Sequence, residues 1–272
     1  MTEKIGSSRL KKIFGLQPLV HWVRLEIRNR RTCALLKRLF PLSTNKELVR
    51  FGPAGDGGYL IPNDLSGIDV CFSPGVSFVS GFEKDCANLG MKVFLADGSV
   101  EGPADAHELF SFTKKFIGGT AREGFITLED WVAASTEDKK SDLMMQIDIE
   151  GHEYEVFLAA SDALMRRFRI FVIEFHFLDE LLNIWSDKYK QIIDVFDKIL
   201  QTHSCVHIHP NNCCGSFRHR SIDIPRVMEF TFLRNDRISH ATYQTGFPNP
   251  LDYDNTSNPP LVLPKCWYKN EK

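Results

Sequence analysis

The sequence lacks a hydrophobic segment long enough to cross a bilayer, because no apolar run approaches the ~20 residues that a spanning helix needs. It also lacks the pattern of a cleaved secretory signal, since Arg24, Glu26 and Arg28 follow the apolar stretch 16–23 directly and interrupt it. These two absences exclude a membrane protein built from spanning helices. They predict a cytoplasmic location.

The seven cysteines contain no C-x-x-C pair, which excludes the commonest zinc-binding and thioredoxin-like motifs. Cys213 and Cys214 are adjacent, a spacing that suits neither a zinc knuckle nor a disulfide framework. We therefore predict reduced thiols in a cytosolic chain. The sequence has no internal repeat either, which excludes a solenoid.

Charge is distributed unevenly, although the net charge is only −2. Residues 1–50 contain twelve Lys or Arg against three Glu and carry +9, so the rest of the chain carries −11. Apolar residues recur at helical spacing between residues 7 and 40, where Pro18 could separate two helices. We expect residues 1–50 to form a basic helical extension packed on the body. The alternative is contact of residues 1–45 with a membrane surface or an anionic partner.

From residue 51 onward, short apolar runs alternate with amphipathic segments, which indicates βαβ units and a parallel sheet. The continuous apolar run at 171–173 fits a sheet covered on both faces. We predict one α/β domain over residues 51–272, with an irregular, proline-rich tail running over the surface from about residue 245. The predicted strands span 68–73, 92–96, 125–128, 143–149, 169–177, 204–209 and 228–233, and the predicted helices 82–89, 128–134, 153–160 and 188–202.

Acidic side chains recur where the predicted strands end. In an open α/β sheet, ligands bind outside the carboxyl ends of the strands, at the point where the strand order reverses. Three of the first four informative strand ends carry an acid, which predicts a ligand site at this edge. These strand ends carry Ser73 and Gly75, then Asp97, then Asp148 and Glu150, and then Glu174 and His176.

Asp97 stands 22 residues after Gly75. An acid about 20 residues past a glycine turn can accept hydrogen bonds from the hydroxyls of a ribose. The sequence has no G-x-G-x-x-G at this turn, so a nucleoside cofactor without a pyrophosphate is favoured over NAD or FAD. The glycine-rich loop Asp56-Gly57-Gly58 could fold over that cofactor. An ordinary solvent-facing Asp97 and an NAD-dependent oxidoreductase are the alternatives.

The segment after the fourth predicted strand combines acids with an imidazole. Asp148 and Glu150 share one side of the strand by its period of two, and His152 follows at the turn. They could orient a cationic donor group, hold a metal or accept a proton, with His152 as the natural base. Glu153 is expected to be only a first-turn acid that interacts with the helix dipole.

Glu174 and His176 also share one side of their strand. Together with Asp148 on the neighbouring strand they could bind a divalent cation such as Mg²⁺ or Mn²⁺, the alternative being a polar pair that supports the site.

Further along the chain, His207 and His209 face the same way, which invites a zinc interpretation, but no third ligand is evident nearby. We expect His209, Asn211 and Asn212 to bind substrate or to support Glu174 and His176.

Several of these segments resemble those of a known protein family. Asp148-Ile149-Glu150-Gly151-His152-Glu153 resembles the D-x-E-G-x-E signature of the FkbM-like methyltransferases. The resemblance extends over roughly residues 50–234. It includes Thr127-Leu128-Glu129, Asp56-Gly57-Gly58-Tyr59, Gly75 with Phe82-Glu83, Asp97, and His207–Asn212 with Glu229–Phe232.

The resemblance implies a Rossmann-like class I methyltransferase fold with a mostly parallel seven-stranded sheet and helices on both faces. It also implies S-adenosylmethionine as cofactor and methyl transfer to an oxygen of a sugar or other small metabolite. The acceptor would be a small molecule or glycan, and no nucleic-acid partner is expected. Ser73-Pro74 departs from the family, since an acid is usual there, and a non-catalytic methyltransferase-like scaffold is therefore the alternative.

The predicted site follows from these observations. The cofactor residues are Asp56, Gly57, Gly58, Gly75, Phe82, Glu83, Asp97, Gly98 and Asp148. The catalytic residues are Asp148, His152, Glu174 and His176, of which Asp148, Glu174 and His176 are also the metal ligands. The substrate residues are Glu150, His209, Asn211 and Asn212.

Overall fold

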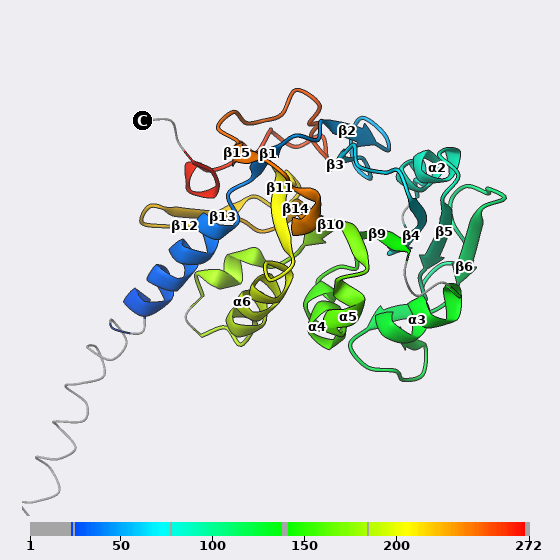
Figure 1. Ribbon diagram of the computed structural model, residues 1–272. Helices are drawn as coiled ribbons and strands as arrows, with labels where there is room; N and C mark the ends of the chain where they lie inside the picture. The colour runs from blue at the N-terminus through cyan, green and yellow to red at the C-terminus, as the bar shows by residue number, and fades with distance from the viewer. Residues whose placement is uncertain (1–22, 24, 77, 138–140, 184, 270–272) are drawn as a thin grey trace, which may run out of the picture.

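A seven-stranded β-sheet lies at the centre of the computed structural model, which describes residues 23, 25–76, 78–137, 141–183 and 185–269 (Figure 1). The spatial order of its strands is β11-β14-β10-β9-β4-β5-β6. Their bounds are β4 Ile68–Pro74, β5 Lys92–Ala96, β6 Phe110–Thr113, β9 Asp142–Ile147, β10 Phe168–Phe175, β11 His203–Pro210 and β14 Met228–Arg234.

The topology is that of a Rossmann-like sheet. Strand β14 pairs antiparallel with both β10 and β11, and the remaining strands run parallel to one another. Without β14, the parallel strands numbered along the chain follow the order 3-2-1-4-5-6 of the doubly wound fold. The order reverses between β4 and β9. The predicted fold, a mostly parallel sheet of seven strands, is confirmed.

Helices cover both faces of the sheet (Figure 1). Alternation along each strand sends neighbouring side chains to opposite faces, so Met144 and Met145 belong to two separate apolar clusters. One face packs against α3, α4 and α6, and the other against α2 and the β2–β3 hairpin. The bounds are α2 Gly81–Asn88, α3 Leu128–Ser135, α4 Glu153–Ala159, α5 Asp162–Met165, α6 Lys188–Ile199, β2 Leu48–Phe51 and β3 Tyr59–Pro62.

One predicted strand of the sheet is wrong. Residues 125–128 were expected to form the third strand, but β8 (Phe125–Thr127) pairs with β7 (Phe116–Gly118) in a separate two-stranded sheet. The third strand is β6, whose partly exposed F-S-F-T sequence at the sheet edge gives little apolar signal. The remaining elements are β1 Leu42–Thr44, β12 Ser216–His219, β13 Ile222–Pro225, β15 Ala241–Tyr243, and the 3-10 helices η1 Leu178–Leu181, η2 Asn235–Arg237 and η3 Lys265–Trp267.

The basic extension packs on the body where the structure describes it. Residues 25–38 are helical, and Leu35, Leu36 and Leu39 on their inner side belong to the main apolar core. The predictions for residues 1–22 and Arg24 lie outside the described residues. Among the helices that the structure describes, none is long and apolar enough to span a bilayer.

Two expectations about the C-terminal part are corrected. The tail does not simply run over the surface, because Trp267 is fully buried against Phe230 and donates its indole N–H to the carbonyl of Asp223. Cys213 and Cys214 form a disulfide between neighbours rather than two reduced thiols. The other five cysteines are free.

Candidate active site

A cavity of about 550 Å³ lies at the carboxyl ends of β4, β5 and β9, where the strand order reverses. This is where a doubly wound sheet binds its ligand. Its polar lining includes the predicted residues Asp56, Asp97, Asp148, Glu150 and His152. Its apolar lining, which was not predicted from the sequence, includes Val76, Phe78, Phe116, Ile117, Phe125 and Ile149.

Gly75 allows β4 and β9 to approach each other at the cavity. Its φ is +92°, and a Cβ atom there would lie 1.7 Å from the carbonyl oxygen of Asp148. A side chain at this position therefore cannot coexist with the present path of the backbone. Gly75 lines the cavity, as predicted for a residue close to the cofactor.

The Asp97 carboxylate is fixed at the cavity wall by neighbouring donors. Its Oδ2 accepts from the Val76 N–H at 3.0 Å, and its Oδ1 accepts from the Ser99 N–H at 2.7 Å and the Ser99 hydroxyl at 2.6 Å. Oδ2 can still accept a further hydrogen bond, whereas Oδ1 already accepts two. The next residue, Gly98, lets an aromatic wall form, since a Cβ there would lie 2.6 Å from the Phe116 ring.

The first strand end carries a buried polar chain in place of the expected acid. The fully buried Ser73 hydroxyl contacts Glu83 Oε1 and lies 2.8 Å from Gln146 Oε1. Burial raises the pKa of Glu83, so a protonated Glu83 can donate to Ser73 while Ser73 donates to Gln146. Phe82, also buried, packs against Phe51 and Tyr59. Phe82 and Glu83 do not line the cavity, and their role at the cofactor stays a prediction.

The residues of the D-G-G loop have different structural roles. Asp56 lines the cavity, whereas Gly57 (φ +75°) makes the turn. A Cβ at Gly58 would lie 2.0 Å from the Pro53 carbonyl. Arg50 fixes the loop by donating to the carbonyls of Pro53 at 2.7 Å and Gly55 at 2.8 Å. Gly57 and Gly58 therefore shape the loop that carries Asp56.

Asp148, Glu174 and His176 form a compact cluster with metal-ligand character. Each residue offers a ligand atom, and the three atoms all lie within 4.8 Å of one another. His176 Nε2 lies 3.8 Å from Asp148 Oδ1 and 3.7 Å from Glu174 Oε1. Asp148 Oδ1 and the buried Glu174 Oε2 find no hydrogen-bond partner among the described residues. Buried carboxylate oxygens without partners are costly, and a bound cation would remove that cost.

The electrostatics of this cluster also favour a cation. Burial raises the pKa of Asp148 to about 7, and the charges of Glu153 and Glu150 act in the same direction. Burial, together with the charges of Asp148 and Glu229, raises the pKa of Glu174 well above its usual value. The carboxylates are therefore desolvated and close to one another, a state that a divalent cation would stabilise.

Glu153 has a role that the sequence did not reveal. It is fully buried, and its Oε1 accepts from the N–H groups of Ile149 at 3.1 Å and Gly151 at 3.0 Å. The same oxygen lies 3.2 Å from His176 Nδ1. Glu153 thus acts at a helix N-terminus as expected, and it also fixes the imidazole so that Nε2 faces the cluster. The sequence feature that could have indicated this role is the position of Glu153 as the last acid of the D-x-E-G-x-E segment.

His152 and Glu150 lie at the cavity rim rather than inside the cluster. The His152 side chain is 55% exposed, and its Nδ1 lies 3.2 Å from Glu155 Oε1. Glu150 adopts a φ of +56°, which is strained for a residue with a side chain, and its Oε2 lies 3.4 Å from His176 Nε2. The strained turn directs a carboxylate toward both the cavity and the imidazole.

A polar row extends the cluster across the sheet. Glu174, Glu229 and His209 lie side by side in register on β10, β14 and β11. Asn211 donates to Glu174 Oε1 at 3.2 Å, so it supports the cluster. Burial raises the pKa of Glu229 to about 7. The sequence did not place Glu229 here, because its position depends on the antiparallel insertion of β14.

Asn212 contacts the tail, and its predicted substrate role stays a prediction. Its amide donates to the carbonyls of Thr256 at 3.1 Å and Asn258 at 2.9 Å, and accepts from the Thr256 N–H at 2.8 Å. Nearby, Asn255 donates to Glu229 Oε1 at 2.7 Å and to Asp56 Oδ1 at 3.3 Å. The tail therefore joins the D-G-G loop to the polar row.

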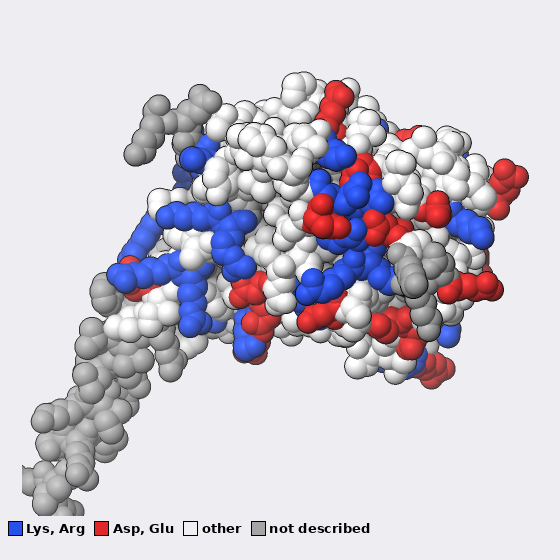
Figure 2. Space-filling view, in the orientation of Figure 1, with Lys and Arg blue, Asp and Glu red and all other residues white. Residues whose placement is uncertain are grey.

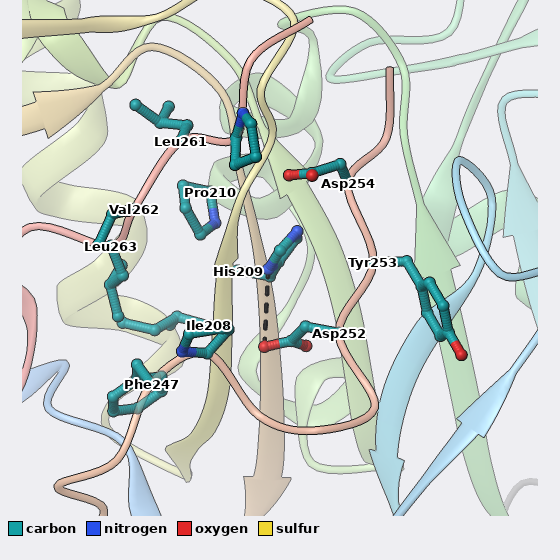
Figure 3. A pocket seen from close by; sticks show the side chains of 12 residues that line it. Ile208, His209, Pro210, Phe247, Asp252, Tyr253, Asp254, Leu261, Val262 and Leu263 are labelled. Atoms are coloured by element: carbon teal, nitrogen blue, oxygen red, sulfur yellow. Dashed lines mark ion pairs between the residues drawn. The ribbon is translucent and has the colours of Figure 1, made fainter. Parts of the chain in front are cut away.

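His209 faces a second, smaller cavity of about 150 Å³ between β11 and the tail (Figure 3). His207 Nε2 lies 2.9 Å from Asp252 Oδ1, and His209 Nδ1 lies 3.6 Å from Asp252 Oδ2. Burial alone would lower the pKa of His209, but Asp252 and Glu229 raise it overall. The Asp252 carboxylate, which comes from the tail, therefore lies next to both imidazoles. His209 is not on the wall of the larger cavity.

Comparison with known proteins identifies the domain. Residues 77–204 match the family described as Methyltransferase FkbM domain. This segment, a little under half of the chain, is therefore similar to FkbM methyltransferase domains. The match confirms the resemblance read from the sequence.

Solved structures give only distant similarity to this FkbM domain. A chain of a fibrillarin/Nop5p complex has 13% identity and a TM-score of 0.35, covering 62% of this chain and 74% of that one. A variant of the 16S rRNA (adenine(1408)-N(1))-methyltransferase from Catenulisporales acidiphilia has 9% identity and a TM-score of 0.29, covering 68% and 98%. Among curated proteins, no significant match is found.

The family match includes the cluster and most of the cavity wall, but not Asp56, Gly75 and Val76, nor the tail. Asp97, Asp148 and Glu174 lie within the matched residues. Asp56 precedes the match, and Glu229 and the tail follow it. The cover of the FkbM site is therefore the part of this chain that the family match does not describe.

Proposed function

We propose that this chain transfers the methyl group of S-adenosylmethionine to a hydroxyl oxygen of a small metabolite or glycan. The observation that carries the proposal is the cavity at the strand-order reversal, with Asp97 on one wall and Asp148 on another. We also propose a cytoplasmic location: five of the seven cysteines are free, and the Cys213–Cys214 disulfide joins sequence neighbours rather than distant parts of the fold.

The cavity residues fit the parts of this cofactor. Asp97 offers its Oδ2 to a ribose hydroxyl, and the aromatic side chains of Phe78, Phe116 and Phe125 offer an apolar wall to a base. Asp56 and Asp148 favour positive charge, and they substitute for the acid that Ser73 replaces. When bound, S-adenosylmethionine supplies an activated methyl group.

We further propose a divalent cation, Mg²⁺ or Mn²⁺, at Asp148, Glu174 and His176. Carboxylate oxygens suit both ions, and a cation bound there would polarise an acceptor hydroxyl. Asp148 belongs to both the cavity and the cluster, so it joins the cofactor site to the cation site. Holding the acceptor oxygen next to the methyl group then supplies much of the rate.

A protein side chain is a weaker candidate for activating the hydroxyl. Burial would lower the pKa of His176, but its hydrogen bond with Glu153 and the charges of Asp148 and Glu150 raise it overall. Its Nε2 faces Asp148 and Glu174, the other proposed cation ligands, at 3.8 and 3.7 Å, so it is placed to bind the cation with them. His152 is largely exposed at the rim. The cluster is therefore better suited to hold a cation than to act as a general base.

Cofactor binding tests the proposal directly. Calorimetric titration of the wild type with S-adenosylmethionine and S-adenosylhomocysteine should show binding, and Asp97→Ala should weaken it by about tenfold or more, since bonds to a charged group are lost. Asp69→Ala, an exposed position on β4, the strand that precedes Gly75, is the matched control and should bind like the wild type. Unchanged binding by Asp97→Ala would remove the cofactor assignment, and binding of NAD instead would favour an oxidoreductase.

Methyl transfer is measured separately. Radiolabelled S-adenosylmethionine is incubated with the protein and pools of hydroxylated acceptors, with Mg²⁺, with Mn²⁺ and with a chelator. We expect transfer with the cations and its loss with the chelator. Cofactor binding without transfer to any pool would favour a scaffold role.

A further inference from the structure

The outer face of the N-terminal helix is basic. The inner side of residues 25–38 packs into the core through Leu35, Leu36 and Leu39. The outward positions recur every three or four residues, as expected for one side of a helix. These exposed positions carry Ile27, Arg30, Arg31, Ala34, Lys37 and Arg38.

The β12–β13 hairpin continues this basic face. Arg220 in its turn pairs with Glu26 of the helix at 3.1 Å, which sets the hairpin beside the helix. The side chains of Arg218 and Arg220 remain 72% and 53% exposed. Two shallow hollows of about 410 and 450 Å³ flank Arg220. Figure 2 shows the resulting concentration of Lys and Arg over the helix and the hairpin.

Exposed apolar side chains border the basic face at the start of the helix. Val23 is 40% exposed and Ile27 is 48% exposed. Trp185, 75% exposed, lies in a turn whose Asn183 and Ser186 carbonyls accept from Arg28. Trp and aliphatic side chains beside a cluster of cations are typical of surfaces that rest in the headgroup region of a bilayer.

The acids in this region do not neutralise it. Glu26 pairs with Arg30 and Arg220, Asp197 with Arg38, and Asp223 with Arg218. Arg31 and Lys37 add charge on the same helix side. The surface therefore keeps a positive charge, while the residues after position 50 carry −11.

We propose that this basic face, made of the outer side of helix 25–38 and the β12–β13 hairpin, docks on an anionic lipid bilayer. Because the apolar side of the helix is buried in the core, attraction to lipid headgroups would dominate, with Val23, Ile27 and Trp185 entering the interface. The exposed aliphatic side chains of Val23 and Ile27 favour a bilayer over a nucleic acid, because they can enter the apolar region of a bilayer but find no partner on a phosphate backbone. The acidic remainder of the chain would also repel a polyanion that extends past the patch.

Co-sedimentation of the full chain with vesicles tests this proposal. We compare phosphatidylcholine vesicles with phosphatidylcholine–phosphatidylserine vesicles, at low and high salt. The wild type should bind only the phosphatidylserine-containing vesicles, and high salt should release it. Arg31→Glu/Lys37→Glu reverses two exposed charges on the basic face and should reduce binding by at least about tenfold.

Lys92→Glu/Lys115→Glu is the matched control, because it makes the same charge change at exposed positions far along the sheet. It should bind vesicles like the wild type. Calorimetric binding of S-adenosylmethionine by every variant checks folding and keeps this result separate from the methyltransferase proposal. Absence of wild-type binding at low salt would overturn the proposal, as would an equal loss in both variants. Binding of single-stranded RNA, but not of vesicles, by the wild type would overturn it in favour of a nucleic-acid surface.

Discussion

The carboxylate of Glu153 lies 3.2 Å from His176 Nδ1 and receives two backbone N–H groups on the same oxygen. The imidazole is therefore held from behind, and its Nε2 faces Asp148 and Glu174. A carboxylate behind a metal-binding histidine fixes the ring orientation and raises its basicity.

Glu153→Gln should weaken cation binding by about tenfold, because the amide keeps the shape but loses the charge behind the imidazole. Titration with Mn²⁺, followed by electron paramagnetic resonance, measures the change. Glu155→Gln, which removes a more exposed acid beside His152, is the control and should bind Mn²⁺ normally. Equal affinities of wild type and Glu153→Gln would show that Glu153 only caps the helix.

Gly75→Ala should destabilise the fold and abolish cofactor binding. Its φ is +92° and its Cβ would meet the Asp148 carbonyl at 1.7 Å, so both strain and overlap arise. Gly90→Ala is the matched control, with φ +88° and no atom within 4 Å. Urea denaturation should give a loss of about 1–2 kcal/mol for Gly90→Ala and more than about 3 kcal/mol for Gly75→Ala. Similar losses would mean that β9 shifts freely away from Gly75.

The stabilisation conferred by Mn²⁺ should grow as the pH rises from 5 to 8. The folded pKa of Asp148 is about 7, above its ordinary value of 3.8, so the folded state holds a proton that the unfolded state has lost. Without a cation, this contribution to stability is complete below the ordinary value and is lost as the pH rises through 7. The cation binds the ionised form and opposes that loss.

The measurement is the difference in the free energy of unfolding with Mn²⁺ and with a chelator at each pH. Taking this difference cancels the pH-dependent contributions of groups far from the cluster. One such group is His203, whose pKa is lowered to about 4 by burial. Asp148→Asn should make the difference small at every pH. A difference that does not change with pH in the wild type would contradict the cation site.

Phe78→Ala should weaken cofactor binding without affecting stability. The ring is 99% exposed at the cavity, so it contributes almost nothing to the core, yet it can cover an adenine base. Calorimetry with S-adenosylhomocysteine measures the affinity, and thermal denaturation the stability. Leu89→Ala, another exposed apolar position at 59%, should change neither. An unaltered affinity of Phe78→Ala would place the base elsewhere in the cavity.

The sequence predicted the sheet well because its inner strands are continuous apolar runs. Their ends also placed Asp97, Asp148, Glu174 and His176 near one edge, as parallel strands require. The strand β6 was missed because an exposed edge strand of four residues leaves almost no apolar pattern.

The rest of the site depends on strand register and on contacts of the tail, which the periodicity of the sequence does not predict. Glu229 reaches Glu174 only because β14 enters the sheet antiparallel and in a particular register. Asp252 and Asn255 come from a tail without periodicity, which is held by individual hydrogen bonds such as those of Asn212. Such bonds depend on the folded path of the chain rather than on local pattern.

The bridge from Asn255 to Glu229 and Asp56 also has a consequence for biosynthesis. Every strand of the sheet precedes Asn255 in the chain. A nascent polypeptide can therefore assemble the sheet while the polar row is still exposed to solvent. The row can be covered only after Asn255 has left the ribosome. A stalled or prematurely terminated product would then expose closely spaced carboxylates to the solvent, a feature that cellular quality control could recognise.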